Sequence, residues 1–182
     1  MFNRILVAVD DTENRQIVVN QAIAVARLTA AKLLLVHVLS PSERDFPNRS
    51  IFLADGGYLD VDLYTTTIQT YDRTWRTYRQ QHLARLQALA EAIKAIGLNV
   101  DIIEQVGQPG PLICQTAEEW DADLIVLGRR GLTAVKELMM GSVSNYVLHH
   151  APCAVLVLQG NSLAEVGETP ADSASDSLTT TR

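Results

Sequence analysis

Apolar residues occur along this chain in short continuous runs, separated by longer stretches in which apolar and polar positions alternate at helical spacing. Four of the runs are rich in valine, leucine and isoleucine, which is typical of strands buried on both faces of a parallel sheet. These runs are Arg4–Val9, Lys32–Leu39, Asp123–Leu127 and Ala154–Leu158. A further strand is predicted over Leu98–Glu104, where the apolar content is lower.

Between the strands, apolar residues recur three or four positions apart, which predicts helices. The first helix covers about residues 13–30, with Thr12 as its N-cap. Pro111 opens another helix that reaches Trp120, and a last helix covers Ser142–His150. The first helix is expected to bury one side composed of Ile17, Ala24, Leu28 and Ala31, with Val18 and Val25 alongside.

A longer amphipathic helix precedes the third strand, and Gly97 is placed to end it. Its apolar positions are Tyr71, Trp75, Tyr78, His82, Leu86, Leu89, Ile93 and Ile96. At ~1.5 Å per residue it should run close to 40 Å, longer than the strand it packs on. Its early turns are therefore expected to overhang the sheet, where they cover an insert or a partner subunit.

Strands that alternate with helices predict an α/β fold with a doubly wound, Rossmann-like, five-stranded parallel sheet in the order 3-2-1-4-5. The domain should span residues 1–160, with an irregular polar insert at about residues 41–70. Residues 161–182 carry almost no apolar side chains and are expected to form a disordered tail. In this order the first and fourth strands are neighbours, so Asp10 and Gly128 should meet at their carboxyl ends.

The charge balance and the ends of the chain limit the function classes. Among 182 residues the formal net charge is −6, which argues against general attraction to nucleic acid or to an anionic membrane. No signal peptide and no membrane-spanning run is apparent, and Cys114 and Cys153 are expected to be buried free thiols. The pattern indicates a cytoplasmic protein.

Candidate chemistry is concentrated after the fourth strand. The segment Gly128-Arg129-Arg130-Gly131 is followed by Gly141-Ser142-Val143-Ser144, at the start of the last helix. Glycines let the backbone approach an anion closely, and a helix start directs free N–H groups toward it, so this spacing favours phosphate binding. Arg129, Arg130 and Lys136 add positive charge. The alternative interpretation is a pair of ordinary turns with Ser142 as a helix N-cap.

Other proteins of this shape fit the residues less well. A phospho-acceptor receiver domain needs an aspartate and a lysine where this chain has Glu104 and Gln159. A dinucleotide enzyme carries Gly-x-Gly-x-x-Gly after its first strand, where Asp10 and Asp11 stand. A P-loop NTPase needs Gly-Lys-Ser or Gly-Lys-Thr, which the sequence lacks.

The arrangement Gly128-x2-Gly131-x9-Gly141-Ser142 resembles the ATP-binding motif of the universal stress protein family. The likeness extends over essentially residues 1–159, apart from the insert. It implies that an adenine nucleotide binds at these positions, with Mg²⁺ carried on the phosphates. The residues that would contact the nucleotide are Asp10, Val38, Gly128, Arg130, Gly131, Gly141, Ser142, Val143 and Ser144.

In that reading Asp10 lies near the ribose or phosphates, the Val38 backbone meets the adenine edge, and Gly128 lines the ribose. The fifth strand, Ala154–Leu158, is expected to be an exposed edge that can pair with a second copy of the chain. The resemblance likewise implies a homodimer through this strand. The expected function is a stress-response or signalling nucleotide sensor. The alternatives are a slow ATPase or other nucleotide-processing enzyme, and a module that binds AMP or cyclic AMP.

No catalytic residue and no protein-held metal is assigned from the sequence. Hydrolysis needs a positioned water and stabilisation of the transferred phosphoryl group, for which only Asp10 is near enough. His37 is expected to be a hydrogen-bonded core histidine, and His149 and His150 to lie at a helix end that favours positive charge. The segment 45–65, with Gly56 and Gly57, is a hypothetical lid over the nucleotide.

Overall fold

A parallel sheet forms the centre of the protein. The computed structural model describes residues 1–12, 14–41, 46–47, 61–129 and 141–159. The sheet has five strands in the order β3-β2-β1-β4-β5, and each adjacent pair is parallel, which confirms the predicted fold class and strand order. The strands are β1 (Arg4–Val9), β2 (Lys32–Leu39), β3 (Val100–Val106), β4 (Leu124–Gly128) and β5 (Ala154–Leu158). The helices are α1 (Arg15–Thr29), α2 (Val61–Ala95), α3 (Pro109–Glu119) and α4 (Ser142–His150).

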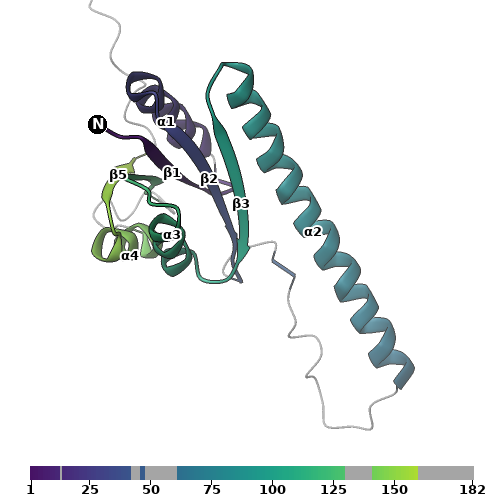
Figure 1. Ribbon diagram of the computed structural model, residues 1–182. Helices are drawn as coiled ribbons and strands as arrows, with labels where there is room; N and C mark the ends of the chain where they lie inside the picture. The colour runs from purple at the N-terminus through teal and green to yellow at the C-terminus, as the bar shows by residue number, and fades with distance from the viewer. Residues whose placement is uncertain (13, 42–45, 48–60, 130–140, 160–182) are drawn as a thin grey trace, which may run out of the picture.

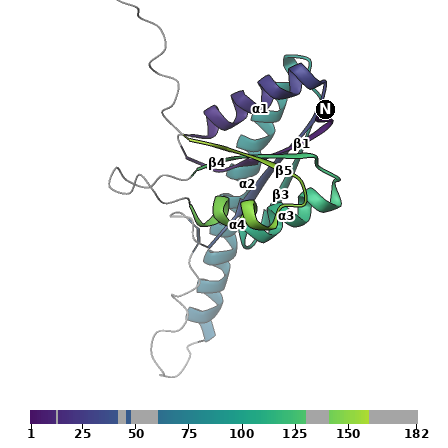
Figure 2. The same ribbon diagram turned by 90° about the vertical axis from the view of Figure 1, so that its left-hand side faces the viewer.

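The helices form a layer on each face of the sheet, with α1 and α2 on one face and α3 and α4 on the other (Figures 1 and 2). Alternate residues of each strand supply the two cores, because successive side chains point to opposite faces. In β2, Leu33 and Leu35 pack beneath α1 and α2, whereas Leu34 and Val36 pack against the α3 and α4 layer. A strand that is covered on both faces must be apolar throughout, which explains the unbroken hydrophobic runs.

The predicted buried side of the first helix is confirmed for Val18 and Ala31 and wrong for Ala24 and Leu28. The helix buries Val18, Val19, Ala22 and Ala26, whereas Leu28 is 80% exposed. Small residues let the helix axis approach the sheet closely, and this packing selects the side with alanines and valines over the side with leucine. Helix α1 also begins later than expected, with Asn14 rather than Thr12 at the N-cap position.

Helix α2 begins ten residues before the predicted Tyr71, at Val61, so part of the expected irregular insert is helical. With 35 residues it spans roughly 50 Å at ~1.5 Å per residue. Figure 1 shows its first turns extending beyond the carboxyl ends of β2 and β3, as the sequence predicted. The threonines near residue 65 hid this helix from sequence reasoning, because β-branched polar residues favour helices only weakly.

Three other boundaries differ from the prediction by a few residues. Strand β3 continues to Val106, because its last residues pair with the end of β2. Helix α3 starts at Pro109 rather than Pro111, and proline suits a first helical position since its missing N–H is unbonded there in any case. Strand β4 starts at Leu124, one residue after the predicted Asp123, and ends at Gly128.

Several predictions fall on residues outside the described ranges. They are the proposed lid at residues 45–65, most of the insert, the tail at residues 161–182, and the phosphate-loop residues Arg130, Gly131 and Lys136. The domain boundaries at 1–160 and 161–182 remain predictions. Among the described residues, no helix is long and apolar enough to cross a membrane.

Candidate functional site

The carboxyl ends of β1 and β4 lie side by side at the centre of the sheet. Their registry places Ile5 opposite Leu124 and Val7 opposite Val126. After β1 the chain turns into α1 on one face, and α4, the helix that follows β4, packs on the opposite face. Connections that diverge in this way leave a crevice at the carboxyl ends of the strands, the usual place for a ligand in an open α/β sheet. Asp10 and Gly128 both lie at this point, as predicted.

Asp10 is half-buried and is held by the turn that follows β1. Its Oδ1 accepts a hydrogen bond of 3.2 Å from the Thr12 N–H and another of 2.7 Å from the Thr12 hydroxyl. Aspartate in such a turn is bonded to the backbone two residues on, which fixes the orientation of the carboxylate. Thr12 therefore orients Asp10 instead of capping α1.

Gly128 faces α1 across a narrow gap. A Cβ placed on it would lie 3.2 Å from Cγ2 of Val18, closer than an ordinary van der Waals contact. A side chain at this position would have to push Val18 aside in a packed core. Glycine therefore preserves both the packing and the bare backbone at the end of β4.

Helix α4 begins at the crevice side with a glycine as its N-cap. Gly141 has an extended backbone (φ −61°, ψ 152°), and no side-chain hydrogen bond caps the helix. The first regular helical bond is donated by the Asn145 N–H to the Gly141 carbonyl, at 2.9 Å. The N–H groups of Ser142, Val143 and Ser144 come before this bond, and a helix start leaves such N–H groups without a partner within the helix. Ser142 is thus the first helical residue rather than the N-cap of the alternative interpretation.

The serines of α4 differ in their surroundings. Ser142 is exposed at the helix start. Ser144 is buried, and its hydroxyl donates to the Gly141 carbonyl at 3.0 Å. The Ser144 side chain therefore stabilises the first turn, and Val143 between them is half-buried against the α3 and α4 core.

Val38 lies near the end of β2, on the far side of β1 from β4. Its side chain is buried in the α3 and α4 core, and its backbone pairs with Gln105 of β3. The Val38 side chain is thus shielded from a ligand, and the backbone role that the family resemblance implies for Val38 stays a prediction. The Arg129 main-chain N–H donates a hydrogen bond to the Leu158 carbonyl of β5. Its guanidinium donates another to the Gln159 side chain.

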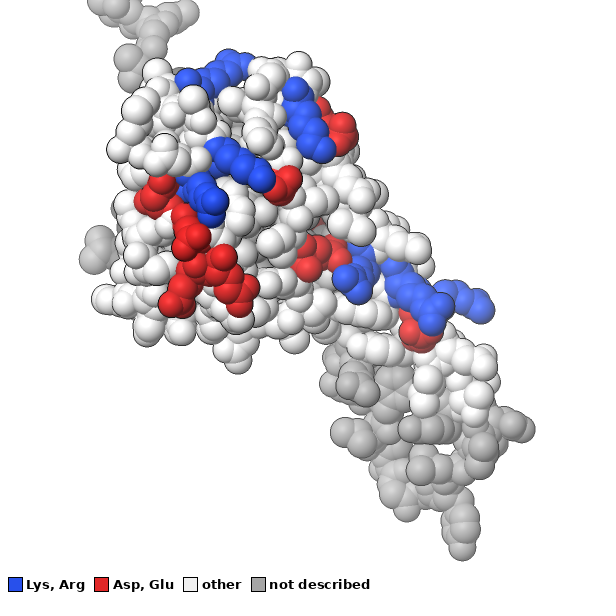
Figure 3. All heavy atoms as spheres, viewed as in Figure 1, with Lys and Arg blue, Asp and Glu red and all other residues white. Residues whose placement is uncertain are grey.

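Charged side chains on the face drawn in Figure 3 alternate in sign instead of forming a basic surface. Many are paired, for example Lys32 with Asp101 at 2.6 Å and Arg79 with Glu104 at 2.8 Å. The Lys32–Asp101 pair is exposed and contributes little to stability, whereas the Glu104 side chain of the other pair is buried. On this face the described residues offer no extended positive surface of the sort that binds a nucleic-acid backbone.

A polar cluster beside Asp10 was missed by sequence reasoning. Asp11 contacts two arginines, at 2.9 Å from Arg15 and 3.2 Å from Arg85, and its Oδ2 lies 2.8 Å from Nδ1 of His82. The ring of His82 stacks on that of His37, with centroids 5.2 Å apart and planes 8° apart. These residues come from the β1–α1 turn, β2, α1 and α2, so only the tertiary structure brings them together.

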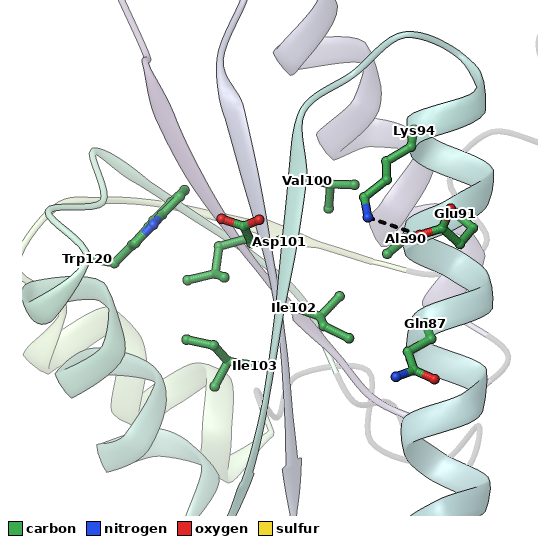
Figure 4. Close-up of a pocket in the computed structure, with 10 residues that line it drawn as sticks. Gln87, Ala90, Glu91, Lys94, Val100, Asp101, Ile102, Ile103 and Trp120 are labelled. Atoms are coloured by element: carbon green, nitrogen blue, oxygen red, sulfur yellow. Dashed lines mark hydrogen bonds and ion pairs between the residues drawn. The ribbon is translucent and has the colours of Figure 1, made fainter.

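A cavity of about 740 Å³ lies elsewhere, along the outer edge of β3 (Figure 4). Val100 and Ile102 face α2 there, whereas Asp101 and Ile103 lie on the side of Trp120. None of the predicted nucleotide-binding residues lines this cavity. It is an open groove on an edge strand, remote from the carboxyl ends of β1 and β4.

Both cysteines are free thiols, as predicted, although only Cys114 is buried and Cys153 is partly exposed. Burial raises the pKa of the Cys114 thiol. Burial and the nearby Asp123 carboxylate likewise raise the pKa of Cys153. Because the thiolate is the reactive form, we expect iodoacetamide at neutral pH to modify both more slowly than free cysteine. A rate equal to or above that of free cysteine would contradict this description.

Comparison with known proteins gives the family. The sequence model described as the universal stress protein family matches residues 1–56 and 58–159. The protein named universal stress protein Sll1388, from Synechocystis, is 34% identical over 161 residues, which are 87% of this chain and 98% of that protein. The chain thus combines a doubly wound parallel α/β fold with a family match over most of its length. The chain belongs to the universal stress protein family.

Solved structures share the fold. The universal stress protein UspA from Lactobacillus plantarum has a TM-score of 0.57 at 25% identity, covering 86% of this chain and 97% of that one. A universal stress protein family member from Arabidopsis thaliana, solved with AMP bound, has a TM-score of 0.56 at 21% identity, with 93% and 99% coverage. At such identities the likeness concerns the arrangement of strands and helices, and the ligand is a property of that protein.

Proposed function

We propose that this protein binds an adenine nucleotide, ATP in the first place, in the crevice between the carboxyl ends of β1 and β4. The observation that carries the proposal is the convergence of Asp10, the bare backbone at Gly128 and the start of α4 at Gly141. Gly128 and Gly141 are two positions of the motif by which the sequence resembles ATP-binding members of the family, and Asp10 is a further nucleotide contact that the resemblance implies. Solved relatives with adenine nucleotides show that the fold itself accommodates such ligands.

Each of the proposed residues would contact a different part of the nucleotide. The carboxylate of Asp10, oriented by Thr12, would accept hydrogen bonds from ribose hydroxyls. The main chain at Val38 would contact the edge of the adenine, and Gly128 would let the sugar approach the backbone. A larger residue at Gly128 would crowd Val18 in the folded protein.

The phosphates would lie at the start of α4. Unbonded N–H groups and the helix dipole favour negative charge at such a position, by about 0.3–1 kcal/mol for the dipole alone. The exposed Ser142 hydroxyl would add a donor, whereas Val143 and Ser144 would contribute through main-chain N–H groups. Arg130 and Gly131 complete the proposed set. Mg²⁺ would bind through phosphate oxygens and water, since it seldom occupies an all-protein cage.

We propose a sensor rather than an efficient enzyme. Asp10 is the acid nearest the crevice, and its Oδ1 is already engaged by Thr12. In-line attack on a phosphoryl group needs a water oriented by a dedicated residue, for which the described residues offer no better candidate. The bound nucleotide would instead be read by a partner protein in the cytoplasm during a stress response.

A homodimer through β5 forms part of the proposal. Strand β5 is an edge of the sheet, with Ala154 exposed and the other residues half-buried. An edge strand carries unpaired backbone groups on its outer side and can pair with a second copy. Sedimentation equilibrium of the full chain should therefore give twice the monomer mass, and a monomer at every concentration would contradict the dimer.

The decisive test is calorimetric titration of the full chain with ATP and Mg²⁺, together with mass spectrometry of any co-purifying nucleotide. We expect saturable binding of ATP and a co-purified adenine nucleotide. No heat at millimolar ATP would overturn the proposal. Titration with AMP and cyclic AMP distinguishes the alternative ligands, because a preference for either one would replace ATP as the physiological ligand.

Hydrolysis is tested separately in single-turnover assays of the wild type and of Asp10→Asn. A sensor should hydrolyse ATP slowly, and Asp10→Asn should change binding more than turnover. A loss of turnover of about a hundredfold at unchanged affinity would instead identify Asp10 as a general base and the protein as an enzyme.

A further inference from the structure

The cluster beside the crevice contains ligands of a kind that metals use. Asp11, His37 and His82 each offer one ligand atom, and these atoms all lie within 4.8 Å of one another. We propose that Asp11, His37 and His82 form a binding site for a divalent transition-metal ion such as Zn²⁺ or Co²⁺, beside the nucleotide site, since Asp10 lines the same cavity. The proposal goes beyond nucleotide binding and does not depend on it.

The surroundings of the three residues favour one small ion. They line a cavity of about 10 Å³, close to the size of a single water molecule. His37 is 4% exposed and His82 is 9% exposed, so the ring nitrogens are shielded from bulk solvent. His82 Nδ1 lies 2.8 Å from Asp11 Oδ2, although among the described residues it makes no aligned hydrogen bond.

The ligand set selects the class of metal. Two imidazoles and a carboxylate suit Zn²⁺, Co²⁺, Ni²⁺ or Cu²⁺, whereas Mg²⁺ and Ca²⁺ prefer oxygen ligands. Three protein ligands leave the fourth tetrahedral position to water. The site should therefore ignore the Mg²⁺ that accompanies ATP.

Binding requires a local adjustment. Ligand atoms around a tetrahedral zinc ion lie about 3.4 Å apart, given metal–ligand distances of about 2.0–2.2 Å. The three side chains must therefore draw together. Because an imidazole binds a metal in its ring plane, one of the two parallel rings must also turn as the ion enters. His82 is the candidate, since it belongs to α2 at the side of the sheet, whereas His37 is held within β2 between two paired strands.

The arginines around Asp11 supply a specific test. Arg15 and Arg85 bind the Asp11 carboxylate and would repel a cation held at the same place. Arg85 is largely exposed and belongs to α2, so its removal should not disturb the core. Arg85→Gln should therefore tighten metal binding, a direction opposite to that expected from loss of a ligand.

The experiment is titration of the full chain with Co²⁺, without nucleotide, followed by visible absorption. Wild type should give the spectrum of a four-coordinate ion, unaffected by excess Mg²⁺. Removal of an outer-shell partner typically costs 10–100-fold in affinity, so loss of a ligand in His82→Gln should cost about a hundredfold or more. Asp11→Asn repeats this test at an exposed position, where folding is not at risk.

The exposed histidines of α4 provide the matched control. His149 and His150 are the remaining histidines of the chain, and both face solvent. The double variant His149→Gln, His150→Gln should keep the wild-type cobalt affinity. A loss in this variant with unchanged affinity in His82→Gln would place the ion on α4 and overturn the proposal. Absence of a cobalt spectrum at millimolar ion would overturn it as well, whatever the outcome with ATP.

A second readout concerns stability. An ion bound by Asp11, His37 and His82 would connect the β1–α1 turn, β2 and α2, and any ligand that binds only the folded state stabilises it. Zn²⁺ should raise the melting temperature of the wild type and of the α4 double variant, but not of Asp11→Asn. An equal rise in all three would contradict a site at Asp11.

Discussion

Replacing Gly141 by valine is expected to weaken ATP binding at least tenfold, which corresponds to about 1.4 kcal/mol. Gly141 has a backbone conformation that valine adopts readily, so the substitution brings no backbone strain. A branched side chain there would, however, stand beside the N–H groups of Ser142 and Val143, where the phosphates are proposed to bind. Calorimetric titration with ATP and Mg²⁺ measures the effect.

The matched control is Gly141→Ala. Alanine and valine are both poor N-cap residues, so the two variants should lose similar helix stability. Their effects on ATP differ only through the size of the side chain that meets the ligand, and alanine should cost much less affinity. Unchanged affinity in Gly141→Val would contradict phosphate binding at α4. Equal losses in both variants would assign the effect to the helix rather than to ligand contact.

Replacing Leu35 by alanine is expected to lower the free energy of unfolding by about 2–5 kcal/mol. Leu35 is fully buried in β2, between β1 and β3, and packs beneath α1 and α2. Its removal leaves a cavity that neighbouring strands cannot close without moving. A domain of this size is typically stable by only about 5–15 kcal/mol, so the loss is a large fraction of the total.

Leu28→Ala is the control for this prediction, because it makes the same chemical change at an exposed position. Leu28 is 80% exposed on α1, and the free energy of unfolding should change by no more than about 0.5 kcal/mol. Urea unfolding of the two variants gives both values. Similar losses in Leu28→Ala and Leu35→Ala would show that α1 buries the face with Leu28, as the sequence pattern had suggested.

Sequence reasoning worked best where one local rule acts alone. The unbroken apolar runs predicted the strands, since only a sheet covered on both faces needs strands of that composition. The alternation of strands with helices predicted their order. It was less successful for α1, where the spacing of Leu28 and Ala24 fits a buried face as well as that of Val18 and Ala22. Periodicity shows that a face is buried, and close packing against the sheet decides which one.

In the candidate site, too, some features could be predicted from the sequence and others could not. Asp10 and Gly128 were predicted to meet, because strand order alone brings the carboxyl ends of β1 and β4 together. The role of Thr12 was not predicted, since a threonine that caps a helix and one that bonds to Asp10 look alike in sequence. The side-chain differences between Ser142 and Ser144 likewise arise from which side of α4 meets the core.

The sequence by itself determined the parallel sheet, its order, the family and the place of Gly128 at the carboxyl end of β4, because these depend on composition, spacing and handedness of connection. Only the tertiary structure decided which side of α1 is buried, how far α2 extends, and that Asp11, His37 and His82 lie within reach of one ion. The reason is physical. Those features depend on contacts between side chains far apart in the chain, whose energies are set by packing and distance rather than by local pattern.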